Sequence, residues 1–263
     1  MAEAPTVHEI YAVKFGENPG GVRGHYFLGP DGDPQDERMR LDYFVWAIRS
    51  PGQDIVLDAG FTAATNRTRH RDHWEDPSAA LARIGVDAAS VPIVILSHLH
   101  YDHCGDLDAF GAATFVLQED EMAFWTGRFA PRREFSRHIE IADIERVIRL
   151  NFAGRVRMVD GLHAVADGVW VDKVAGHTPG MQATYVRTAQ GIVVLASDSS
   201  HFFENVEQDK PFAVHTDVVG LYRSFDTMKA AATSGLVIAG HDPLITERFP
   251  AATGHEGRVF RIA

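Results

Sequence analysis

Apolar residues along this chain recur mostly at alternate positions or in short β-branched runs, which is the pattern of half-buried and fully buried strands. We expect strands at residues 9–15, 43–48, 55–57, 93–96, 114–117, 156–159, 169–174, 183–187, 192–196 and 236–239. Helical spacing occurs in four stretches, residues 77–84, 119–126, 143–150 and 218–234. Strands and helices together predict a layered α/β protein. Because no repeat, low-complexity block or Ser/Gly linker interrupts the pattern, we expect a single domain, residues 1–263.

Several of the expected strands end directly in a polar cluster. Asp58 follows the strand at 55–57, His98 follows the strand at 93–96, Asp198 follows the strand at 192–196, and His241 follows the strand at 236–239. In layered α/β proteins, loops that carry ligands commonly lie at the ends of strands. The sequence therefore predicts one site, assembled at one edge of the sheets from segments far apart in the chain.

The composition of the chain argues against several classes of partner. The net charge is −11 with histidine neutral, whereas nucleic acids and anionic membrane surfaces are bound through clustered Lys and Arg. No apolar run approaches the roughly 18 residues needed to cross a bilayer. A single cysteine, Cys104, excludes an internal disulfide framework, and the first residues lack the charge and apolar core of a secretory signal. We expect a cytoplasmic protein with a small-molecule substrate and no membrane or nucleic-acid partner.

Histidine is unusually abundant, with 14 residues, and four potential metal ligands fall in the run His98-Leu-His100-Tyr-Asp102-His103. Alternation along the strand lets His98 and His100 point the same way, and a turn then brings Asp102 and His103 to a second position nearby. Imidazole and carboxylate together suit zinc, and also iron, manganese or cobalt. The alternative is a histidine cluster without metal, which would be costly to desolvate.

This run resembles the signature of the metallo-β-lactamase superfamily, whose members are mostly hydrolases. The further motifs of that family occur in order: Asp58 in Leu-Asp-Ala-Gly, His177 in Gly-His-Thr-Pro-Gly, Asp198 at a strand end and His241 in Ala-Gly-His-Asp-Pro. Together they span about residues 55–243. The fold that the resemblance implies is a four-layer αβ/βα sandwich, in which two mixed sheets are flanked by helices.

The resemblance also implies a division of the ligands between two divalent metal ions, zinc first. One ion would be bound by His98, His100 and His177, and the other by Asp102, His103 and His241. Asp198 would bridge the two ions, and Asp58 would support the site from behind. The hypothesis is a hydrolase in which a hydroxide held between the ions attacks a carbonyl, while Asp102 and Asp198 orient or relay the proton.

Within the superfamily, the sequence is most similar to the N-acyl-homoserine lactonase group, on the residues His-Thr-Pro-Gly-Met-Gln at 177–182 and Gly-His-Asp-Pro at 240–243. Those lactonases have a tyrosine three residues after the bridging aspartate, where this chain has His201. Histidine could donate a hydrogen bond or a proton to the leaving alkoxide, and His201 is therefore a third catalytic candidate. A lactone is the first expectation for the substrate. Another ester, an amide or a thioester is the alternative, and a non-enzymatic metal-stabilised binding protein comes third.

Residues around the motifs have two interpretations. Four aromatic residues are candidates for the substrate-binding wall, with ordinary core packing as the alternative: Phe124, Trp125, Phe202 and Phe203. His70 and His73 lie in a polar stretch, residues 66–76, which we expect to be solvated surface without metal. Because related lactonases are often dimers, the resemblance also favours a homodimer.

Overall fold

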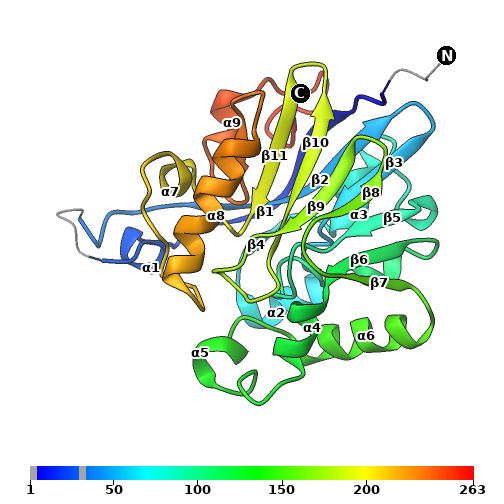
Figure 1. Ribbon diagram of the computed structural model, residues 1–263. Helices are drawn as coiled ribbons and strands as arrows, with labels where there is room; N and C mark the ends of the chain where they lie inside the picture. Colours follow the sequence, from blue (N-terminus) through cyan, green and yellow to red (C-terminus); the bar gives the residue numbers. More distant parts are fainter. Residues whose placement is uncertain (1–4, 30–33) are drawn as a thin grey trace.

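The computed structural model describes residues 5–29 and 34–263, and it has two β-sheets stacked face to face with helices on both outer sides (Figure 1). The four-layer αβ/βα sandwich expected from the sequence is confirmed. No helix in the described part of the chain is both long and apolar enough to cross a membrane.

The first sheet runs in the order β13-β1-β2-β3-β5-β6-β7, with the short β4 paired to β1. Its strands are β1 (Glu9–Asn18), β2 (Leu41–Ser50), β3 (Gln53–Leu57), β4 (Asp72–His73), β5 (Ile93–Ile95), β6 (Thr114–Gln118), β7 (Val156–Val159) and β13 (Val259–Arg261). The β1, β2 and β3 pairings are antiparallel, whereas β3, β5, β6 and β7 run parallel. The sheet is therefore mixed.

The second sheet is smaller and runs in the order β12-β11-β10-β9-β8. Its strands are β8 (His163–Ala166), β9 (Val169–Lys173), β10 (Gln182–Thr188), β11 (Gly191–Ser197) and β12 (Val237–Ala239). Only β11 and β12 pair in parallel here, and the other pairings are antiparallel. Both sheets thus contain parallel neighbours whose carboxyl ends lie together.

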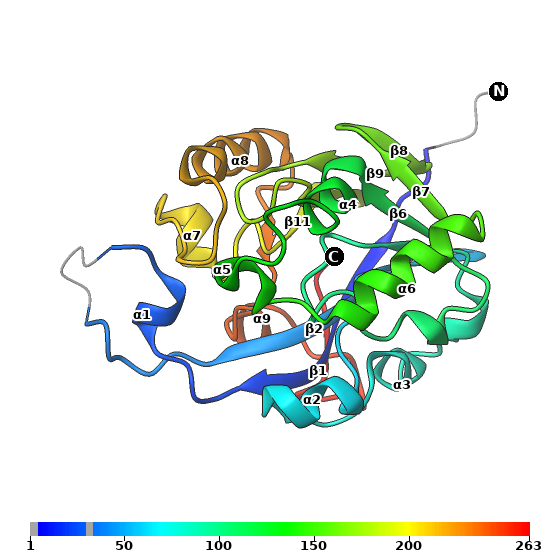
Figure 2. The same cartoon turned by 90° about the horizontal axis from the view of Figure 1, so that it is seen from below.

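Helices cover the two outer faces, with α8 on one side of the sheets and α3 and α6 on the other (Figure 2). The helices are α1 (Arg23–Tyr26), α2 (Ala63–Arg69), α3 (Pro77–Ala82), α4 (Glu119–Trp125), α5 (Arg133–Ser136), α6 (Ile141–Phe152), α7 (Phe203–Glu207), α8 (Val218–Ala231) and α9 (Ile245–Arg248). Three apolar clusters fill the three spaces between the four layers.

Strand β2 shows how the sequence produces this layering. Tyr43 and Val45 pack with the helices of the first layer, whereas Phe44 and Trp46 pack between the two sheets. Successive side chains of a strand point to opposite faces, so a strand buried on both faces must be apolar almost throughout. That is why β2 reads as a nearly continuous apolar run rather than as an alternating one.

All ten expected strands and four expected helices are present, with ends shifted by a few residues. Strands β4, β8 and β13 and the short helices α1, α2, α5, α7 and α9 were not predicted, and each is only two to seven residues long. His70 is exposed at the end of α2, as expected. For His73 the prediction of solvated surface was wrong, because its ring packs against Phe15 and Phe61.

A buried carboxylate, Glu121 of α4, joins the two loops that follow β5 and β9. Its Oε1 accepts hydrogen bonds from Leu99 N at 3.0 Å and Trp125 Nε1 at 2.6 Å, and its Oε2 accepts from Thr178 Oγ1 at 2.6 Å and Gly180 N at 3.1 Å. Burial raises the pKa of Glu121, although these four donors act to lower it. A Cβ on residue 180 would lie 2.1 Å from the Glu121 nitrogen, so glycine is required for this approach.

We expect Glu121→Gln to lower the free energy of unfolding by about 2–3 kcal/mol, because the amide NH₂ would face donors that now bond to oxygen. Glu119→Gln, an exposed position on the same helix, is the matched control and should change it by no more than about 0.5 kcal/mol. Urea unfolding followed by circular dichroism measures both. Equal stability of the two variants would show that the Glu121 bonds do not hold the loops.

Candidate metal centre

The polar residues predicted at four strand ends do meet at one edge of the two sheets. Asp58 follows β3, the run from His98 follows β5, Asp198 follows β11, and His241 follows β12. β3 and β5 are parallel neighbours in the first sheet, and β11 and β12 are parallel neighbours in the second. Their carboxyl ends therefore bring residues from the whole length of the chain to one place.

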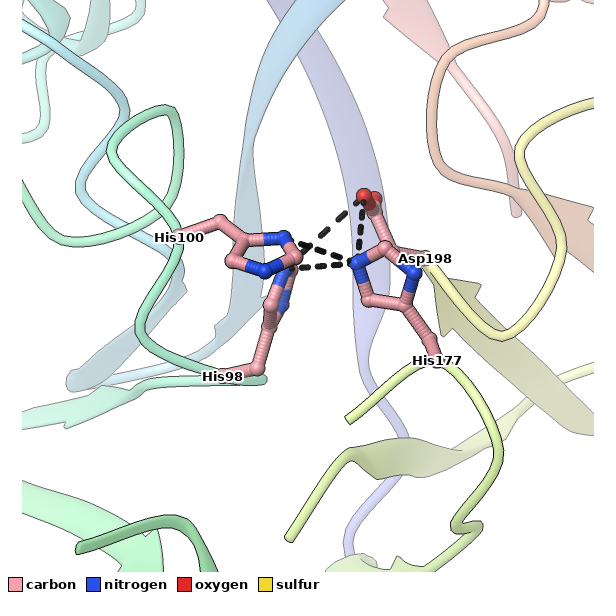
Figure 3. A group of neighbouring side chains, drawn as sticks. All are labelled: His98, His100, His177 and Asp198. Carbon is pink, nitrogen blue, oxygen red and sulfur yellow. Dashed lines mark hydrogen bonds and ion pairs between the residues drawn. The ribbon is translucent and has the colours of Figure 1, made fainter. Parts of the chain in front are cut away.

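One group of side chains consists of His98, His100, His177 and Asp198, all buried and pointing toward one another (Figure 3). The Nε2 of His177 lies 3.2 Å from Nε2 of His98 and 2.9 Å from Nδ1 of His100. His98 and His100 come from the loop after β5, and His177 comes from the turn between β9 and β10. One potential ligand atom of each residue lies within 4.8 Å of the others.

A second group, Asp102, His103 and His241, lies on the other side of Asp198. Oδ1 of Asp198 is 3.2 Å from Nε2 of His103 and 2.9 Å from Nε2 of His241. Oδ2 faces the first group, at 3.4 Å from Nε2 of His177. Asp198 thus turns one oxygen to each group, which is the position required of a bridging carboxylate.

Hydrogen bonds behind three of the rings fix which nitrogen faces the centre. Nδ1 of His177 bonds to the carbonyl of residue 214 at 2.7 Å, Nδ1 of His241 to the carbonyl of residue 42 at 2.8 Å, and Nδ1 of His103 to Oδ2 of Asp58 at 2.8 Å. These oxygens only accept, so each Nδ1 carries the hydrogen. In the neutral ring, Nε2 then presents a lone pair to the centre, as in histidines that ligate metals.

The donor set fits divalent cations. Bare imidazole nitrogens at 2.9–3.2 Å from one another repel unless a cation lies among them. Among the described residues, Nε2 of His103, Nε2 of His241 and Oδ1 of Asp198 are buried without a hydrogen bond of acceptable geometry. Buried polar atoms are rarely left in that state. Neutral histidines with carboxylates form the ligand set of zinc and of related transition metals.

Electrostatics separates the two groups of histidines. Burial, with the neighbouring histidines, holds the pKa of His98, His100 and His177 well below the ordinary value, although the Asp198 carboxylate acts in the opposite direction. Burial also acts to lower the pKa of His103 and His241, but nearby carboxylates, Asp198 first, raise both. The carboxylates around His103 and His241 therefore favour a positive charge at this position. A metal cation can supply that charge in place of a proton.

Asp58 supports the site from behind, as the resemblance implied. Its Oδ1 accepts from Ser97 N at 2.7 Å, and its Oδ2 accepts from Ser97 Oγ at 2.9 Å, Ser197 Oγ at 3.1 Å and His103 Nδ1 at 2.8 Å. Its backbone has a φ of 64°, in the left-handed region that a residue other than glycine rarely adopts. A strained turn at the end of β3 thus places the Asp58 carboxylate where it bonds to residues of both sheets, Ser97 after β5 and Ser197 of β11.

His201 lies beside the centre, three residues after Asp198. Its Nε2 is 3.0 Å from Oδ2 of Asp198, and its ring stacks with that of His241 at 5.6 Å and meets Phe212 edge-on at 4.3 Å. Among the described residues, its Nδ1 is buried and has no hydrogen-bond partner. His201 is thus positioned next to the reacting centre and has unused hydrogen-bonding capacity.

A cavity of about 620 Å³ opens over the centre, and Asp102, Asp198, His201 and His241 form part of its floor. The polar side chains in its lining include Tyr43, Tyr101, Arg71, Arg69, Arg137 and His138. A smaller cavity of about 220 Å³ shares His100 and His177 with it and is lined by Phe124, Trp125 and Phe135. The centre is therefore accessible to a small molecule from a side that carries arginines and tyrosines and from an aromatic side.

The four aromatic substrate candidates divide into two pairs. Phe124 and Trp125 line the smaller cavity, and Trp125 meets the His100 ring at 5.5 Å. For Phe202 and Phe203 the expectation was wrong, because they are 1% and 3% exposed and line neither cavity at the centre. Phe202 packs in the cluster between the first sheet and its helices, and Phe203 packs between the sheets. They follow Asp198 closely in sequence, but their side chains point into the protein.

Sequence reasoning missed several residues that shape the site. Tyr101 lies inside the histidine run, and this position could have predicted that it lies near the site. The sequence signal for Glu121 was weaker: a carboxylate among apolar helix positions predicts a buried charge. Arg71 gave no signal, because an arginine in a polar stretch ordinarily faces solvent.

Comparison with known proteins agrees with this geometry. The family model described as the metallo-beta-lactamase superfamily matches residues 39–241. The N-acyl homoserine lactonase AttM of Azorhizobium caulinodans is 27% identical over 248 residues, which is 85% of this chain and 90% of that protein. The N-acyl homoserine lactonase AiiA of Bacillus thuringiensis subsp. kurstaki is 32% identical over 135 residues, 51% of this chain and about half, 48%, of that protein.

Solved structures show the same fold. An N-acyl homoserine lactone hydrolase with the product N-hexanoyl-L-homoserine at its catalytic metal centre superposes with a TM-score of 0.77 at 21% identity, over 93% of this chain and 97% of that one. AidC, a dizinc quorum-quenching lactonase, gives a TM-score of 0.71 at 17% identity, over 91% and 89%. Together with the match over residues 39–241, this shows that the chain belongs to the metallo-beta-lactamase superfamily.

Proposed function

We propose that this protein is a hydrolase with two divalent metal ions, and that its substrate is a lactone. The main support for the proposal is that two groups of potential metal ligands lie on either side of Asp198, which lines an open cavity. The similarity to N-acyl homoserine lactonases supports the lactone. Assembly into a homodimer and a cytoplasmic location stay predictions.

His98, His100 and His177 would hold one ion, and Asp102, His103 and His241 the other, with Asp198 between them. Zinc is our first choice because it accepts this mixture of nitrogen and oxygen ligands, and iron, manganese or cobalt are the alternatives. When bound, the ions would supply a water nucleophile near neutral pH and polarise the carbonyl that it attacks.

The side chains around the centre have separate tasks in the opening of a lactone ring. Asp102 and Asp198 line the cavity, where they would orient or relay the proton that the attacking water loses. His201, beside Asp198, donates a hydrogen bond or a proton to the ring oxygen as it leaves. Phe124 and Trp125 bind an apolar substituent of the substrate in the smaller cavity.

A second candidate is the hydrolysis of another ester, an amide or a thioester at the same centre. It is favoured by His201, because the resembling lactonases have a tyrosine at this position. A protonated imidazole can transfer its proton completely to a leaving group, whereas a tyrosine hydroxyl normally only donates a hydrogen bond. A leaving group that needs full protonation, such as an amine, would then also be served.

The first prediction from this proposal concerns metal content. The purified protein should contain about two divalent ions per chain, and chelation should lower its melting temperature by roughly 5 °C or more, because ligands that bind only the folded state stabilise it. His241→Gln should retain about one ion, measured by plasma mass spectrometry. His70→Asn, at an exposed residue outside both groups, should retain both. Well-folded wild-type protein without metal would contradict the proposal.

A substrate panel tests the lactone directly. We expect kcat/KM for γ-lactones and acyl-homoserine lactones to exceed that for open-chain alkyl esters, amides and thioesters of similar size by on the order of tenfold or more. Titration of the acid released, on the metal-loaded protein, measures every member in the same way. A preference for thioesters or amides would favour the second candidate.

The role of His201 is tested by its dependence on the leaving group. His201→Phe should lower kcat on an alkyl lactone by about 100-fold, because an alkoxide needs a donated hydrogen bond or a proton to leave. The same variant should lower kcat on a nitrophenyl ester by no more than about threefold, since a nitrophenolate leaves without one. His201→Tyr, which restores a donor, should stay within about tenfold of the wild type on the lactone. Equal losses on both substrates would assign His201 a purely structural role.

A further inference from the structure

Three arginines line the larger cavity of a chain whose net charge is −11: Arg69, Arg71 and Arg137. The described carboxylates that line this cavity are Asp102 and Asp198, and both belong to the metal-ligand groups. Two divalent ions there would exceed the two carboxylates in charge, so the loaded centre would be positive. The cavity is therefore a positive region in an acidic protein.

Two of the three arginines have carboxylate partners of their own. Arg69 is 2.7 Å from Oε1 of Glu140, and its guanidinium also donates to the carbonyls of residues 137 and 139. Arg137 lies at 3.4 Å from Glu134. Both arginines thus have a carboxylate within ion-pair distance.

Arg71 differs from them. Among the described residues its guanidinium has one hydrogen bond, from Nε to the hydroxyl of Tyr101 at 3.4 Å. Across residues 5–29 and 34–263 it has no ion pair with a carboxylate. A half-buried arginine normally has such a partner, because desolvation of an unpaired charge is unfavourable. Within this part of the chain the terminal nitrogens of the guanidinium have no hydrogen-bond partner, and they can bind a group that enters the cavity.

The backbone of Arg71 is held firmly although its side chain is not paired. Asn66 bonds to it twice, accepting from its N–H at 2.8 Å and donating to its carbonyl at 2.9 Å. The next two residues form β4 against β1, and the ring of His73 packs on Phe15 and Phe61. The guanidinium is thus presented from a fixed base, as a recognition group should be.

Arg71 also lies on the side of the metal centre. Its partner Tyr101 precedes Asp102, and the hydroxyl of Tyr101 is 3.1 Å from that of Tyr43, whose ring meets His241 at 5.6 Å. A substrate with its carbonyl over the centre would therefore extend part of its structure toward Arg71. A guanidinium presents two parallel N–H groups, which match the two oxygens of a carboxylate.

We propose that Arg71 determines substrate specificity by binding a carboxylate, so that the substrate is a lactone with a carboxylate on or next to its ring. This inference rests on the proposed lactone hydrolysis. The competing possibility is that Arg71 only donates to a neutral carbonyl of the substrate, as an amide substituent would offer.

The test compares two γ-lactones that differ only in charge, 5-oxotetrahydrofuran-2-carboxylate and its carboxamide. We expect the wild type to favour the carboxylate in kcat/KM by about tenfold or more, since a charge-assisted pair is stronger than a neutral hydrogen bond. Arg71→Met should abolish this preference, mainly through a higher KM for the carboxylate, and should leave the carboxamide within about threefold. Arg67→Met, at an exposed arginine of α2 that does not line the cavity, is the control and should behave as wild type.

A binding measurement separates failure of this inference from failure of the proposed function. Tetrahydrofuran-2-carboxylate and its carboxamide have no carbonyl in the ring and cannot be opened, so calorimetry on the metal-loaded protein reports recognition alone. Tighter binding of the carboxylate that is lost in Arg71→Met supports the inference even if no lactone is hydrolysed. Equal treatment of carboxylate and carboxamide by the wild type overturns it, whether or not both lactones are opened. The inference is also overturned if Arg71→Met weakens the binding of the carboxylate and the carboxamide equally.

Discussion

The convergence of bare imidazole nitrogens on the two oxygens of Asp198 is the constraint that the surrounding structure has to satisfy. Five histidines contribute nitrogens that point inward, and all five rings are buried. In the protein alone such an arrangement is unfavourable, because lone pairs face one another away from water. Cations would remove that cost, but only if the rings are already oriented. The hydrogen bonds behind the rings and the turns at the strand ends supply this orientation.

That orientation comes from both sheets and not from one loop. Asp58 at the end of β3 bonds to Ser97 after β5 and to Ser197 at the end of β11, so one carboxylate crosses from the first sheet to the second. Glu121 does the same on the opposite side, between the loop after β5 and the turn that carries His177. Two buried carboxylates thus hold together the loops that the stacked sheets bring close, and the sandwich fixes how far apart these loops lie.

The sequence predicted those parts of the site whose signal is local. Four ligands lie within one short run, and the others each end a recognisable strand, so the alternation of apolar residues located them. What sequence could not supply is the direction in which a side chain points after a strand has ended. Phe202 and Phe203 follow Asp198 closely, yet the chain turns there into α7 and buries both rings. No sequence signal indicated Arg71, because its segment is polar and looks solvent-exposed. The pairing of β4 with β1 places this segment at the cavity.

Two residues at the cavity, His201 and Arg71, are placed to contact different parts of a substrate. His201 contacts Asp198, which in the proposed reaction places it where the leaving oxygen would develop charge. Arg71 lies beyond Tyr101 and Tyr43, which places it beside a substituent of the proposed substrate and not beside the reacting bond. In the proposed reaction the first residue would influence the rate of ring opening, and the second would influence which rings are bound. Because the two residues lie at separate positions, the fold and the metal ligands can preserve the reaction while the substrate changes. Such a change of substrate would come from different residues in the wall of the cavity that includes Arg71.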